Sequence, residues 1–152
     1  MRSHRCGRPE ELLWFAVLLL GACTAPAAPP PAAAMLGEWN YSSAPVASDR
    51  PSLNAGLLVT IVVESADGMH FRGRVPRWFA GDVGVAPDVF GPVTGSMDGN
   101  DQVTVLISRT APGEPPLAIV GVLSGDVLTV LESRLEATPG PFPAASRFER
   151  AR

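Results

Sequence analysis

From residue 36 onward, apolar residues recur in short runs with a period of two. No long segment shows the 3.6-residue period of an amphipathic helix. Gly, Asp, Asn and Pro separate the runs, as is typical of turns between strands. The pattern therefore predicts an all-β domain. We expect eight strands, at about residues 37–43, 56–64, 69–75, 88–97, 102–109, 117–123, 127–133 and 146–150.

The connections between these strands alternate between short and long. Three are compact and rich in Gly, Asp and Asn, which suits hairpins, and four are longer and rich in Pro and Ala. In an antiparallel meander, successive connections lie at opposite ends, so the tight turns share one end (the floor) and the long loops the other (the mouth). We expect an eight-stranded antiparallel up-and-down barrel, because closure removes exposed strand edges. The long connections are 44–55, 76–87, 110–116 and 134–145.

One face of the strands supplies the residues expected to point into the barrel. Such a barrel either fills with side chains or holds one small ligand. The opposite face is also apolar, with residues such as Leu58, Leu106 and Leu131, which favours a protein partner or a homo-oligomer. The inward set is Leu57, Val59, Ile61, Val63, Phe71, Val75, Val103, Val105, Ile107, Leu128 and Val130.

The N-terminal segment has the features of an export signal. Three arginines precede an apolar run over residues 12–20, which is too short to span a bilayer. Leu20-Gly21-Ala22-Cys23 then resembles the lipobox of bacterial lipoproteins. That resemblance implies a signal peptide over residues 1–22 and a lipid on Cys23. The alternative is an ordinary secretory signal that is cut after residues 25–27 and leaves no lipid.

The rest of the chain divides into a linker and one domain. Residues 23–35 are rich in Pro and Ala and predict a spacer, and residues 36–152 form the β-barrel domain. With Cys6 in the signal and Cys23 as the anchor, no disulfide is available. In Gram-negative lipoproteins Asp after the Cys marks inner-membrane retention. Thr24 therefore implies the periplasmic face of the outer membrane, with attachment through the N-terminal lipid.

A second resemblance lies at the first strand. Gly37-Glu38-Trp39 is similar to the Gly-x-Trp of lipocalins and avidins, the calycin group of small barrels. In lipocalins an Arg near the end of the chain packs over this Trp and closes the barrel floor. The resemblance implies that role for Arg150, through a cation–π contact with Trp39.

The sequence offers little for catalysis. His70 is the only histidine after the signal and is expected to point outward, and lysine is absent. No nucleophile elbow or phosphate loop occurs, so we expect no enzyme activity, no metal and no cofactor. The net charge of −3, without basic clusters, also argues against nucleic acid as a partner.

Binding is the better expectation. Arg77, Trp78 and Phe79 fall in a predicted mouth loop, where loops on a rigid scaffold often carry recognition. Arg50 and Phe142 occupy two other mouth loops. The alternative is that these aromatic side chains fold down and plug the barrel. We therefore predict a protein that binds a small apolar ligand in its barrel. The alternative function is an interaction module for an envelope protein, protease inhibition included.

Overall fold

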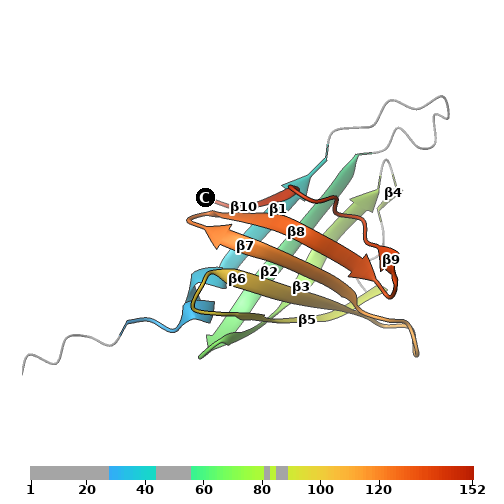
Figure 1. Ribbon diagram of the computed structural model, residues 1–152. Coiled ribbons are helices and arrows are strands. Elements are labelled where there is room, and N and C mark those ends of the chain that lie inside the picture. Colours follow the sequence, from blue (N-terminus) through green and yellow to red (C-terminus); the bar gives the residue numbers. More distant parts are fainter. Residues whose placement is uncertain (1–27, 44–55, 81–82, 85–88) are drawn as a thin grey trace, which may run out of the picture.

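The computed structural model describes residues 28–43, 56–80, 83–84 and 89–152. Within these ranges the chain forms a closed antiparallel barrel of eight strands (Figure 1). The predicted all-β barrel is therefore confirmed. The expected signal peptide at residues 1–22, Cys23 and Arg50 lie outside the described residues.

Eight strands build the wall, and each pairs with the next wall strand along the chain. Two short strands lie outside this series, β4 beside β3 and β9 beside β8. The last strand, β10, pairs with β8 on one side and with β1 on the other, which closes the barrel. The strands are β1 (Gly37–Ser42), β2 (Leu57–Asp67), β3 (His70–Ala80), β4 (Val83–Gly84), β5 (Phe90–Met97), β6 (Gln102–Arg109), β7 (Leu117–Ser124), β8 (Val127–Leu135), β9 (Thr138–Pro139) and β10 (Arg147–Arg150).

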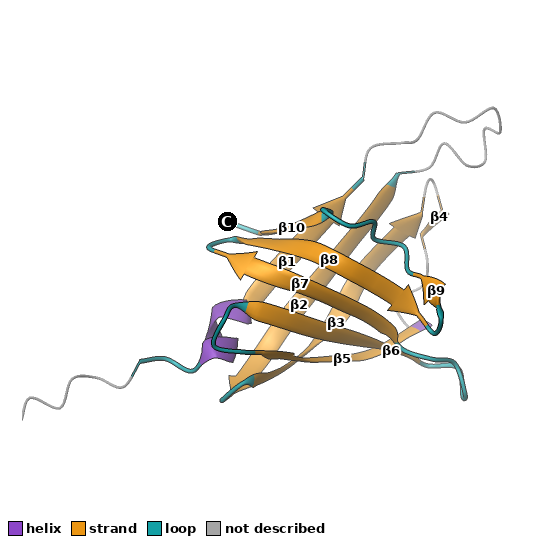
Figure 2. Cartoon of the chain, in the orientation of Figure 1, coloured by secondary structure: helices purple, strands orange, loops and turns teal. Residues whose placement is uncertain are grey.

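The three tight turns all lie at the floor, as the alternation of connections predicts (Figure 2). Gly68 and Gly125 adopt φ of 58°, a left-handed conformation that glycine accepts without a steric penalty. In the β5–β6 turn, the Asp98 carboxylate accepts hydrogen bonds of 2.9 Å from the backbone N–H groups of Asn100 and Gln102. Local turn chemistry thus fixes where each hairpin reverses.

Strand β3 is longer than the sequence predicts. It was expected to end at residue 75, but it continues through Arg77, Trp78 and Phe79 to Ala80. Between the Thr60–Arg77 and Val62–Arg74 pairs, β3 carries one more residue than β2, which is a β-bulge around Pro76. A proline has no N–H to donate and is tolerated at a bulge, so it does not end the strand.

The domain also begins earlier than expected. A 3₁₀ helix, η1 (Pro31–Met35), lies across the floor of the barrel (Figure 2). Ala32 and Met35 are buried in the core, and the Met35 carbonyl accepts a 2.7 Å hydrogen bond from Nε1 of Trp39. Residues 31–35, expected to belong to the spacer, therefore close the floor.

Side chains fill the lumen from floor to mouth. All members of the expected inward set are buried except Leu57, which is partly buried against the core. Near the floor, Phe71 lies opposite Gly95, where a Cβ atom would come within 2.2 Å of the Phe71 ring. Glycine at this position makes room for the aromatic ring, so the two residues pack as a unit.

Candidate functional site

The floor brings together the three residues expected to close the barrel. The Arg150 guanidinium lies over the Trp39 ring, 4.4 Å from its centroid. It also donates to the carbonyls of Ala34 and Leu36, and its Nε lies 2.8 Å from the Asp126 carboxylate. Gly37, with φ of 120°, leaves room for this guanidinium, since a Cβ there would lie 3.3 Å from Nη1. Gly37, Trp39 and Arg150 therefore form a structural clasp.

A cluster of aromatic rings closes the mouth. Phe142, from the connection before β10, is buried, and its ring contacts those of Tyr41, Phe148 and Trp78 at centroid distances of 5.0 to 5.7 Å. The Ser133 hydroxyl holds its backbone, donating to the Phe142 carbonyl and accepting from its N–H. Phe142 is a core residue that plugs the barrel, which was one of the two alternatives for it.

Trp78 has two roles at the mouth. It is 9% exposed and part of the core, and its ring stacks on Phe90 at 4.5 Å with an interplanar angle of 27°. This aromatic pair also lines a pocket of about 220 Å³. The other walls come from Val89, Arg109, Leu117, Leu135 and Pro141. We call this the mouth pocket.

Arg109 is the charged member of the mouth pocket, and the sequence did not single it out. It ends β6, opposite Phe90 in the β5–β6 ladder. Its Nε atom lies 2.7 Å from Oε2 of Glu114, in the β6–β7 connection, but this contact lacks hydrogen-bond geometry and Nε is buried. The sequence signal that could have found it is an arginine at the mouth end of a strand, two residues after the inward Ile107.

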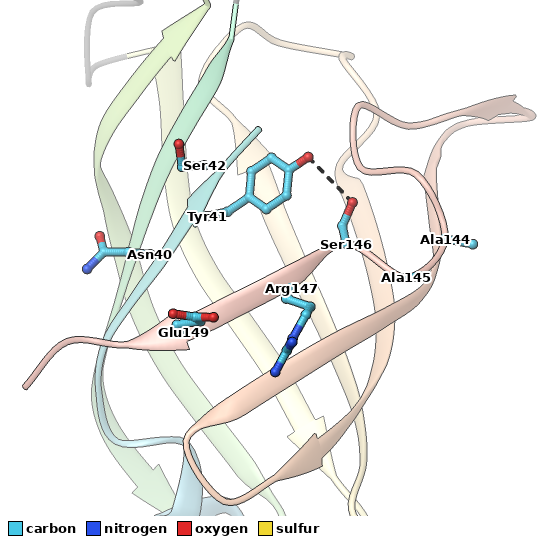
Figure 3. Close-up of a pocket in the computed structure, with 8 residues that line it drawn as sticks. All are labelled: Asn40, Tyr41, Ser42, Ala144, Ala145, Ser146, Arg147 and Glu149. Carbon is cyan, nitrogen blue, oxygen red and sulfur yellow. Dashed lines mark hydrogen bonds between the residues drawn. The ribbon is translucent and has the colours of Figure 1, made fainter. Parts of the chain in front are cut away.

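A second hollow lies in the barrel wall, where β1 and β10 separate (Figure 3). The strands pair at Trp39–Arg150 and Asn40–Glu149, and beyond this point the wall opens into a hollow of about 660 Å³. The hydroxyls of Tyr41 and Ser146 reach toward each other across it, at 3.4 Å. Its lining mixes hydroxyl, amide and charged groups with small side chains, so it lacks the apolar wall of the mouth pocket.

The remaining sequence-predicted binding residues lie on the outer wall. Arg77 and Phe79 are exposed on β3, and Phe79 is paired with Leu58 of β2. Both Phe79 and Leu58 are 40% exposed. The structure therefore separates Trp78, which faces inward, from its two neighbours, because adjacent residues of a strand point to opposite faces.

The described residues contain no group of three or more His, Cys, Asp or Glu side chains arranged to hold a metal ion. His70 is exposed at the start of β3. In the same part of the chain, no helix has the length and apolar character needed to cross a bilayer. Searches of family models, curated proteins and solved structures return no match to this chain.

Proposed function

We propose that this protein is a non-catalytic, lipid-anchored β-barrel of the cell envelope that binds a small apolar ligand at its mouth. The observation that carries the proposal is the mouth pocket itself. Its walls are the Trp78–Phe90 stack and the apolar side chains of Leu117, Leu135 and Pro141. A concave, mostly apolar site with one polar group is the usual form of a small-molecule site.

The mouth is a better position for the ligand than the interior. The lumen residues from Trp39 at the floor to Phe142 at the mouth form one buried cluster, and a close-packed core leaves no room for a ligand. The mouth pocket lies where strands β3, β6 and β8 end and strands β5 and β7 begin, so a ligand reaches it without displacing the core.

The sequence supports the envelope location, and the fold supports the calycin-like assignment. The lipobox-like residues 20–23 support a lipid on Cys23, and Thr24 supports the periplasmic face of the outer membrane. The closed eight-stranded barrel is compatible with a calycin-like domain. The Arg150–Trp39 contact supports the same assignment.

Titration with 1-hexanol, a neutral apolar probe, tests the binding proposal. The indole N–H signal of Trp78 in a ¹H–¹⁵N correlation spectrum should shift, and that of Trp39, at the floor, should not. Replacing Leu135→Trp should fill the pocket and abolish the shift. The matched variant Leu131→Trp, on the outer wall of the same strand, should keep it. A Trp78 signal that no concentration of hexanol moves would refute binding at the mouth.

One observation favours a second function, docking of a protein on the outer wall. Leu58 and Phe79 form an exposed apolar pair near the mouth, and Leu106, Val122 and Leu131 are exposed on the strands β6 to β8. Exposed apolar patches on a folded domain often mark an interface with a partner or a second copy.

A further inference from the structure

The mouth pocket contains a cation whose present partner is poorly placed. The Arg109 side chain is 31% exposed, yet its Nε atom is buried and has no well-directed hydrogen bond. In folded proteins, a buried N–H group almost always has a hydrogen-bond acceptor. Because Arg109 lines the pocket, a ligand with an anionic group can supply that acceptor.

Glu114 occupies the place that such an anion would take. Its carboxylate lies 2.7 Å from Nε of Arg109 but is 39% exposed, at the surface of the β6–β7 connection. This connection bends at Gly113, with φ of 81°, and the Glu114 N–H is bonded to the Ala111 carbonyl. Glu114 can therefore return to water when another carboxylate takes its place, without leaving a charge buried.

The dimensions of the pocket limit the ligand. At roughly 30 Å³ for each water-sized group, a volume of about 220 Å³ holds about seven such groups. Arginine binds carboxylates through two parallel N–H···O bonds, a geometry that the Glu114 contact does not reach.

We propose that the mouth pocket binds a small carboxylic acid of about this size. The apolar body lies against the Trp78–Phe90 stack, and the carboxylate binds Arg109 in place of Glu114. This inference rests on the proposed function, since it names the class of ligand for the same pocket. The exchange replaces one carboxylate by another as the partner of Arg109, so the guanidinium keeps an anionic partner.

Three probes of one chain length test the role of charge: hexanoate, 1-hexanol and hexylamine, each titrated into the purified protein. The shift of the Trp78 indole N–H gives the dissociation constant, and Trp39 is the internal reference. Hexanoate should bind about tenfold more tightly than hexanol, as a charge-assisted hydrogen bond predicts. Hexylamine should bind more weakly than either.

Variants of the ion pair separate the roles of its two members. Arg109→Gln should abolish the preference of the pocket for hexanoate over hexanol. Glu114→Gln removes the competing carboxylate and should tighten hexanoate binding alone, by about threefold or more. Arg134→Gln, which breaks the exposed pair with Glu132 on β8, is the matched control and should change neither constant.

The possible failures are distinguishable. Equal binding of hexanoate and hexanol, or a preference that survives Arg109→Gln, overturns the carboxylate inference and leaves the apolar pocket intact. A Trp78 signal that responds to none of the three probes overturns the proposed function, and the inference with it.

Discussion

The guanidinium of Arg150, near the end of the chain, lies 4.4 Å from the ring centroid of Trp39, in the first strand. The same guanidinium donates to the carbonyls of Ala34 and Leu36, at the end of the 3₁₀ helix and just after it. One side chain thus joins the first strand, the last strand and the floor. The contact has the form that the calycin resemblance implies for Arg150.

Replacing Arg150→Gln should lower the free energy of unfolding by about 1–3 kcal/mol, because it removes a cation–π contact and hydrogen bonds to two carbonyls. Thermal unfolding followed by circular dichroism measures this as a decrease of several degrees in Tm. Arg152→Gln, at an exposed residue of the same charge, is the control and should change Tm little. Equal stability of the two variants would show that the clasp does not stabilise the barrel.

Replacing Gly95→Ala should destabilise the barrel, because the new Cβ would lie 2.2 Å from the Phe71 ring and 2.4 Å from the Thr104 carbonyl oxygen. Overpacking of this kind costs about 1–3 kcal/mol. Urea unfolding gives the change in the free energy of unfolding. Gly99→Ala, in a floor turn where nothing lies within 4 Å of the added atom, should stay within about 0.5 kcal/mol of the parent.

Replacing Cys23→Ser should release the protein from the membrane, since the proposed lipid is attached to that thiol. Fractionation of an envelope-competent bacterial host measures this as a shift from the detergent-soluble to the aqueous fraction. Cys6→Ser, within the proposed signal peptide, supplies the control and should leave fractionation unchanged. Membrane retention of the Cys23 variant would favour another mode of attachment.

Replacing Phe79→Ser should weaken any association through the outer wall, because it removes half of the exposed Leu58–Phe79 pair. Sedimentation velocity over a range of protein concentrations measures the self-association. Met69→Ser, at a side chain of comparable exposure in a floor turn, is the matched control. If the parent protein remains monomeric at every concentration, a second copy of the chain is excluded as the partner. The partner on the outer wall would then have to be a different protein.

The fold could be predicted because its signals are local. Period-two runs give the strands, and Gly and Asp at the reversals give the floor turns. The extension of β3 could not be predicted, because Pro76 indicates a strand end unless the bulge opposite β2 is known. The closure of the floor by η1 was missed for a similar reason, since Pro and Ala are typical of a spacer, and the helix is buried only through the tertiary contacts of Ala32 and Met35.

The candidate site was predicted only in part. Trp78 was singled out, and it forms a wall of the mouth pocket. Arg109 was missed, because its importance depends on strands that are distant in sequence. Its neighbours in the pocket include Trp78 and Leu135, from β3 and β8. Composition and spacing do not show which of the arginines faces an apolar hollow.

The position of η1 sets the length of the linker between the lipid anchor and the barrel in the proposed anchored form. Seven residues lie between Cys23 and Pro31, where the floor helix begins, so the chain takes eight Cα–Cα steps between the two. A chain of that length reaches at most about 29 Å when fully extended. The floor of the barrel would therefore stay within about 29 Å of the lipid surface and would face it. The mouth pocket would therefore be open to solutes of the aqueous compartment and would not contact the acyl chains of the membrane.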